Sequence, residues 1–212
     1  MTSSKNDPLT ERNPRRSVMA VTLLAGTCAA ALPVLAVVVL LLARNPQIEG
    51  GSINSALAFN IAVWLTLAAS ALWALVELAQ PGGSRRAWTY LLPAPILLGS
   101  GMAAELARTP SSTWTTRIVG GNAATCVTLV TLFSMPILTS LIYVLRSVVV
   151  TTPRFAGAAA GLLAGSVSAA IYVWHNQELS LLFVATWPGL AVMIVAVLGA
   201  IVGRKFLSCA VS

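Results

Sequence analysis

Six apolar stretches occupy almost the whole chain, and each is long enough to cross a lipid bilayer. They cover residues 18–43, 54–79, 87–107, 118–145, 155–174 and 181–203. A helix rises about 1.5 Å per residue and the hydrocarbon core is about 30 Å thick, so about 20 apolar residues span it. The sequence therefore predicts an all-α integral membrane protein. Its single domain, a bundle of six transmembrane helices, would lie between two short tails; the three parts are residues 1–17, 18–207 and 208–212.

Composition supports a membrane protein and argues against a nucleic-acid-binding protein. Charged residues make up 9% of the 212 residues, and the mean hydropathy is +0.85. A soluble domain carries about 25% charged residues. The net charge of +7 comes from Lys and Arg at the ends of the apolar stretches, without a basic stripe interleaved with aromatic residues. We expect these charges to fix the topology of the protein in the lipid bilayer. We expect the protein to make no direct contact with nucleic acid.

The distribution of basic residues predicts which ends of the helices face the cytoplasm. If the N-terminus is cytoplasmic, ten of the 13 Lys and Arg residues lie on the cytoplasmic side and three on the outer side. Basic loops are retained in the cytoplasm, so this asymmetry favours N- and C-termini that are both cytoplasmic. We expect a multi-pass membrane protein.

Glycines recur every four residues in the last two apolar stretches. Gly157, Gly161 and Gly165 lie on one face of the fifth helix, and Gly199 and Gly203 repeat the spacing in the sixth. Small residues at this spacing let two helix backbones approach closely. The contact can form within the chain, which we favour, or across a homodimer.

Residues that would support catalysis are scarce. The chain has no P-loop, no paired-carboxylate motif and no HExxH sequence, and its three cysteines show no CxxC spacing. Glu77 and Glu105 lie near predicted helix ends rather than in the middle of the membrane. We therefore expect no enzymatic activity, no metal ion and no cofactor.

One polar cluster is predicted on the outer side. His175 and Glu178 lie between the fifth and sixth helices, and Cys126 lies near the outer end of the fourth. An imidazole, a carboxylate and a thiol that converge there could bind a metal ion or respond to an oxidant, as a periplasmic sensor would. The alternative interpretation is an ordinary polar turn.

The second half of the chain resembles the NrsF-like family, small six-helix membrane proteins named as negative regulators of the sigma factor SigF. The resemblance is strongest over about residues 145–204. It is carried by TPRFAG at 152–157, AGLLAG at 160–165, LFVATW at 182–187 and LGAIVGR at 198–204.

The resemblance implies an anti-sigma factor that holds an extracytoplasmic-function sigma factor at the inner membrane and releases it on a periplasmic stress signal. Arg12, Arg15 and Arg16 are the candidate contacts with the sigma factor, although each could serve topology alone. The family pattern has two cysteines; Cys126 matches one, and Asn176 stands at the position of the other. The alternative function is a small transport or membrane-complex subunit without a regulatory role.

Overall fold

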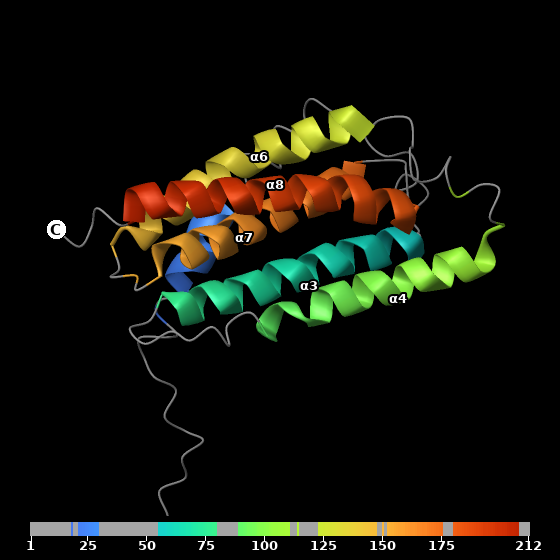
Figure 1. Cartoon of the computed structure of the whole chain (residues 1–212), viewed down its shortest axis with the longest axis horizontal. Coiled ribbons are helices and arrows are strands. Elements are labelled where there is room, and N and C mark those ends of the chain that lie inside the picture. Colours follow the sequence, from blue (N-terminus) through green and yellow to red (C-terminus); the bar gives the residue numbers. More distant parts are fainter. Residues whose placement is uncertain are drawn as a thin grey trace, which may run out of the picture.

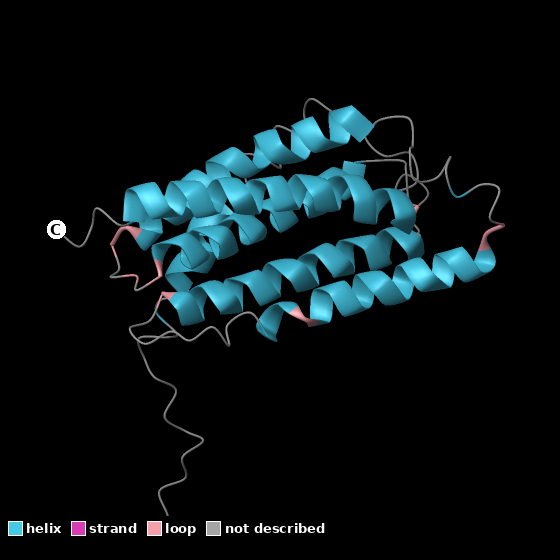
Figure 2. Cartoon of the chain, viewed as in Figure 1, coloured by secondary structure: helices cyan, strands magenta, loops and turns pink. Residues whose placement is uncertain are grey.

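Five long helices make up most of the part of the chain that the structure describes, and they run roughly along one direction (Figure 1). They are α3 (Ser55–Leu78), α4 (Pro93–Arg108), α6 (Ala123–Leu145), α7 (Pro153–His175) and α8 (Leu181–Leu207). Residues 21–29 are also helical, and no strand occurs among the described residues (Figure 2). This computed structural model describes residues 18, 21–29, 55–79, 89–110, 114, 123–147, 150, 152–175 and 180–207, with the backbone alone for 55 and 175.

The five helices are long and apolar enough to cross a membrane, with hydropathy between 1.3 and 2.4. Large apolar side chains cover their outer surface, for example Tyr143 (76% exposed) and Ile201 (60% exposed). Such a surface is suited to lipid rather than water. The protein is therefore an all-helical membrane protein. Of the first predicted span, only residues 18 and 21–29 are described, so the count of six and the sides of the two termini stay predictions.

Two helix ends differ from the predicted spans. The third apolar stretch was expected to be helical from residue 87, but α4 begins at Pro93, after a 3₁₀ turn at residues 89–91. Proline has no N–H to donate to the carbonyl four residues earlier, so it is accommodated at the first position of a helix. At the other end of the chain, α8 continues past Gly203 to Leu207. Its last turn carries Arg204 and Lys205, whose positive charges are favourable at a helix C-terminus.

Helix α7 lies at the centre of the bundle and α4 at its margin. In an 18-residue apolar segment of α7, 83% of the residues are buried inside the protein, whereas the corresponding share for α4 is 11%. Helix α7 packs against α3, α6 and, most extensively, α8. Among the described helices, α4 makes its main contacts with α3 and α8. The core is therefore built around α7, and α4 covers only part of it.

The glycines of α7 face those of α8. A Cβ built on Gly157 would lie 2.8 Å from the Cα of Gly203, and one built on Gly161 would lie 2.8 Å from the Cα of Ala196. Real Cβ atoms do not approach backbone this closely, so any larger residue would push the two helices apart. The small-residue faces thus allow backbone-to-backbone packing within one chain.

The helical residues 21–29 pack against α6. The hydroxyl of Ser140 donates a hydrogen bond to the carbonyl oxygen of Gly26 (3.1 Å). A Cβ on Gly26 would lie 3.3 Å from the Cγ2 of Val144. This contact attaches the N-terminal helical segment to the bundle close to the end where α6 terminates.

Candidate functional site

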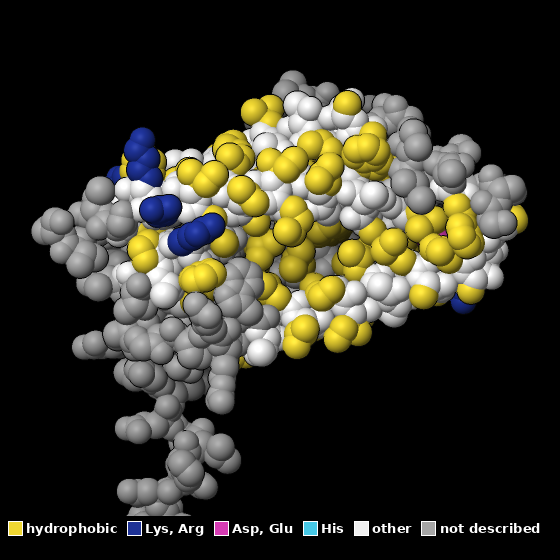
Figure 3. All heavy atoms as spheres, viewed as in Figure 1, with side chains coloured by type: hydrophobic (Ala, Val, Ile, Leu, Met, Phe, Trp, Pro, Cys, Tyr) yellow, Lys and Arg dark blue, Asp and Glu magenta, His cyan; other side chains and the backbone are white. Residues whose placement is uncertain are grey.

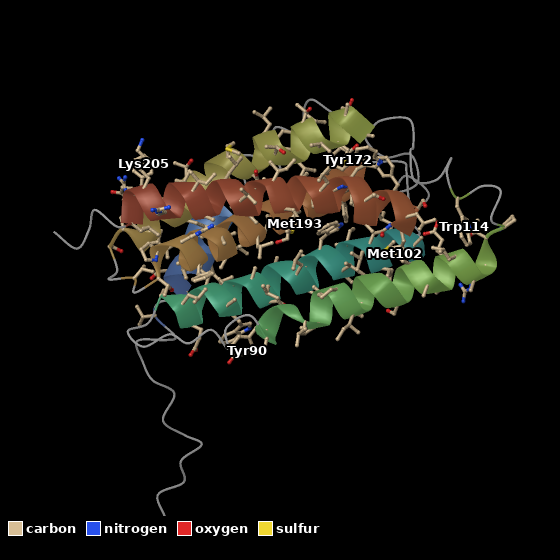
Figure 4. All side chains as sticks on the ribbon, in the orientation of Figure 1. Tyr90, Met102, Trp114, Tyr172, Met193 and Lys205 are labelled. Carbon is tan, nitrogen blue, oxygen red and sulfur yellow. The ribbon has the colours of Figure 1, made fainter. Side chains whose placement is uncertain are left out.

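Cys126, the candidate sensor thiol, lies in the first turn of α6 and is fully buried. It belongs to an apolar cluster that includes Tyr172 and Val173 of α7 and Phe183 of α8. The Tyr172 side chain packs in the same buried cluster as this thiol. Figure 4 labels Tyr172 toward the same end of the bundle as Trp114. A thiol in this position is shielded from soluble reagents while the three helices stay packed.

The other two candidate sensor residues are only partly placed. His175 is the last residue of α7, one helical turn beyond Tyr172, and its side chain lies outside the described residues. Glu178 also lies outside the described residues. The Cys126–Tyr172 contact brings the start of α6 to the last turns of α7, so Cys126 is near the position where His175 begins the turn to α8. The convergence of all three side chains stays a prediction.

Glu105 makes the most extensive polar contact between described helices, and sequence reasoning did not find it. Its carboxylate accepts hydrogen bonds from the Ser180 hydroxyl (2.7 Å) and from the backbone N–H groups of Leu181 (2.6 Å) and Leu182 (3.3 Å). The first N–H groups of a helix have no partner within the helix, and the positive end of its dipole favours an anion. Glu105 of α4 therefore caps the N-terminus of α8.

This cap binds the residue that directly follows the turn predicted to sense a signal. Ser180 is the residue at which the α7–α8 turn ends, and its carbonyl oxygen accepts the first hydrogen bond of α8 from Val184 (3.0 Å). The described residues that flank the turn are thus the end of α7 on one side and, on the other, Ser180, which Glu105 binds; residues 176–179 lie outside the described residues. The expected position of Glu105 near the outer end of its helix is consistent with this contact.

Basic residues gather at the opposite end of the bundle. Arg146 follows α6, Arg154 lies in the first turn of α7, and Arg204 and Lys205 lie in the last turn of α8; all four are exposed. The guanidinium carbon of Arg146 lies 4.8 Å from the ring centroid of Phe206, and the Lys205 ammonium lies 5.9 Å from it. Figure 3 shows Lys and Arg side chains collected there, with Lys205 labelled in Figure 4. The candidate sigma-factor contacts Arg12, Arg15 and Arg16 lie outside the described residues.

Chemically reactive and charged side chains are few among the described residues. Within the described ranges, no three His, Cys, Asp or Glu residues come close enough to form a metal site. The charged side chains of these ranges lie at or near helix ends, with the basic end opposite the Glu105 cap. The fold and the site thus define a multi-pass helical membrane protein with distinct polar surfaces at its two ends.

Comparison with known proteins identifies the family. The chain belongs to the family described as "NrsF: Negative regulator of sigma F", which matches residues 9–208. This match confirms the resemblance and extends it from residues 145–204 to nearly the whole chain. Family membership indicates a regulatory rather than a catalytic protein.

Two curated relatives align with this chain over about two thirds of their own lengths. The "Probable anti-sigma-F factor NrsF" of Azospira oryzae is 32% identical over 142 residues, which are 66% of this chain and 67% of that protein. The "Anti-sigma-F factor NrsF" of Caulobacter vibrioides is 29% identical over 139 residues, which are 63% of this chain and 64% of that protein. No solved protein structure matches the chain.

Proposed function

We propose that this protein is an anti-sigma factor of the inner membrane that holds an extracytoplasmic-function sigma factor and releases it on a periplasmic signal. The observation that carries the proposal is the family match over residues 9–208, which includes the basic tail with Arg12, Arg15 and Arg16. The two relatives named above are both described as anti-sigma-F factors. Five membrane-capable helices support attachment of the regulator to a membrane.

Docking of the sigma factor is assigned to the basic end of the bundle. Arg146, Arg154, Arg204 and Lys205 project from that end, and the positive-inside rule favours its cytoplasmic placement. The tail adds Arg12, Arg15 and Arg16 to the same side if the first apolar stretch spans the membrane. An electropositive surface of this kind accelerates association with an acidic protein surface and fixes its orientation.

Sensing is assigned to the opposite end, at the α7–α8 turn. Cys126, His175 and Glu178 are the proposed sensor residues. The burial of Cys126 against Tyr172 and the Glu105 cap on α8 support this proposal, because a signal that disturbs the turn would act on both. Helices α7 and α8 run from this turn to the basic end and pack closely over their shared glycine face.

Affinity purification from the native membrane tests the docking proposal. The tagged full-length protein is extracted in mild detergent, and the proteins that elute with it are identified by mass spectrometry. We expect a near-stoichiometric sigma factor. The triple variant R12Q/R15Q/R16Q should retain several-fold less of it, whereas Lys5→Gln, which changes a basic residue of the same tail, should retain the wild-type amount.

Two results would contradict the docking proposal. A sigma factor that elutes equally with the triple variant and the wild type would exclude the three arginines as contacts. Elution of other integral membrane proteins without any sigma factor would favour the membrane-complex subunit instead.

A sigma-factor-dependent reporter gene tests the sensing proposal. We expect His175→Ala to abolish induction by oxidants or thiophilic metal ions while basal repression and protein level stay normal. Cys28→Ala, at an exposed cysteine far from the turn, serves as the control. Normal induction of the His175→Ala variant would remove this residue from the proposed sensor.

A further inference from the structure

An apolar groove opens between α4 and α8 on the surface that faces lipid. It has a volume of about 600 Å³, and every residue that lines it is apolar. Helices α3 and α7 contribute its floor, including Trp64 and Leu162, and α8 contributes Met193 and Val197 from its exposed side. Figure 3 shows the hollow among hydrophobic side chains. A volume of this size is in the range of sites that hold a small apolar ligand.

The groove exists because α4 does not close against α8. At Gly189, which lines the groove, an added Cβ would meet no atom within 4 Å. Water is a poor occupant, since the lining is almost entirely apolar and a bound water needs two or more polar partners. Within a bilayer the natural occupant is an acyl chain, because the hydrocarbon core surrounds this surface.

Two arginines lie at one end of the groove. Arg204 follows the lining residue Ala200 by four residues in α8, and Arg154 precedes the lining residue Ala158 by four residues in α7. Residues four apart lie on the same face of a helix, one turn from each other. Both side chains are exposed. Figure 3 shows Lys and Arg side chains on the same face of the molecule as the hollow.

We propose that this groove is a binding site for an anionic phospholipid of the cytoplasmic leaflet. One acyl chain lies in the groove between α4 and α8, and the phosphate group lies at Arg154 and Arg204. Basic residues beside an apolar groove between transmembrane helices are a recurrent arrangement for anionic headgroups. Arg154 and Arg204 also belong to the basic end assigned to sigma-factor docking, but lipid binding itself requires only that the bundle sits in a membrane, so it is tested without a sigma factor.

Charge and length favour this ligand over a second copy of the chain. Two copies that met through this face would bring the arginines of both near one interface, where like charges repel. From Ala185 to Ala200 the groove follows sixteen residues of α8, which rise about 22 Å along the helix. One leaflet contributes a hydrocarbon layer of about 15 Å, so the groove is long enough to hold one acyl chain of that leaflet.

Retention of lipids by the full-length protein tests the proposal. The protein is reconstituted with equal amounts of phosphatidylglycerol and phosphatidylethanolamine, re-extracted in mild detergent, and analysed by native mass spectrometry. We expect the wild type to retain phosphatidylglycerol preferentially. The variant R154Q/R204Q should lower this retention by about fivefold or more, since each basic residue near an anionic headgroup contributes about that factor. Arg146→Gln, at the same end but beside Phe206, should change it little.

A second variant tests the groove itself. Gly189→Leu places a side chain in the open space of the groove and should displace the acyl chain, so phosphatidylglycerol retention falls several-fold. Gly99→Leu is the matched control, because Gly99 is exposed on α4, its added Cβ would also meet nothing within 4 Å, and it does not line the groove. Equal retention of the two lipids by the wild type, or unchanged retention in both R154Q/R204Q and Gly189→Leu, would overturn the proposal. Dimers without bound lipid in the wild type would identify a second copy as the occupant and would also overturn it.

Discussion

Replacement of single glycines with alanine should separate the glycines that pack against backbone from those that do not. A Cβ on Gly161 would lie 2.8 Å from the Cα of Ala196, and a Cβ on Gly189 would meet nothing within 4 Å. Gly165 is intermediate, with the Cα of Val192 at 3.1 Å. Because the obstructing atoms at Gly161 belong to the backbone of α8, a change of side-chain rotamer cannot relieve the clash.

The size of the effect follows from two opposing terms. Overpacking of a tight interior costs about 1–3 kcal/mol, whereas Gly→Ala in a helix interior gains about 0.5–1 kcal/mol. The free energy of unfolding should therefore fall by about 1–2 kcal/mol for Gly161→Ala, and it should be unchanged or slightly higher for Gly189→Ala. In a protein of this size, a loss of this magnitude lowers the midpoint of thermal unfolding by roughly 2–8 °C.

Thermal unfolding of the purified protein in detergent measures these midpoints through its tryptophan fluorescence. We expect Gly161→Ala to have the lowest midpoint, Gly165→Ala an intermediate one, and Gly189→Ala a midpoint at or above that of the wild type. Equal midpoints for Gly161→Ala and Gly189→Ala would refute the conclusion that α7 and α8 meet through backbone contact. Each variant serves as a control for the other two, because all three changes add the same methyl group to a helix.

Three further predictions concern the two ends of the bundle. Glu105→Gln should lower the free energy of unfolding by about 1–2 kcal/mol, because it weakens charge-assisted hydrogen bonds to the start of α8; hydrogen exchange at the Leu181 amide should accelerate, whereas Arg108→Gln should leave it unchanged. Cys126 should resist a maleimide reagent in the folded protein and react after unfolding in SDS, which mass spectrometry of the labelled peptide would show; rapid labelling of the folded protein would contradict its burial against Tyr172. Fusions at the C-terminus should be fluorescent with green fluorescent protein and inactive with alkaline phosphatase; the reverse pattern would invert the topology.

Most of the bundle could be predicted because hydropathy identifies a transmembrane helix with few alternatives. In hydrocarbon every backbone polar group must be bonded within its own segment, so an apolar run of sufficient length becomes a helix. Helix α4 shows where this reasoning is least accurate. Its apolar run begins before Pro93, but the missing proline N–H shifts the start of the α-helix to that residue.

Hydropathy predicts which segments are helices, but another sequence feature is needed to predict where each helix lies in the bundle. Hydropathy gave no reason to place α7 at the centre, since its value of 1.6 is below the 1.9 of α3 and α6. Lipid tails are as apolar as leucine, so apolarity alone does not bring helices together in a membrane. The glycine spacing of α7 and α8 was the informative feature, because small residues permit close backbone packing. The spacing could not decide between contact within one chain and contact between two, and the geometry at Gly157 and Gly203 shows the former.

The Glu105 cap could not be derived from sequence because its partners lie 75–77 residues further along the chain. A carboxylate near a helix end is ordinarily assigned to the headgroup region, where it is hydrated at little cost. Its role became visible only when α4 and the start of α8 were seen at the same end of the bundle. An acidic residue at the end of one span and a serine that opens another are together consistent with such a cap. The pairing is specific here because Ser180 and the first N–H groups of α8 bind both oxygens of one carboxylate, which places the residue that follows the proposed sensing turn beside α4.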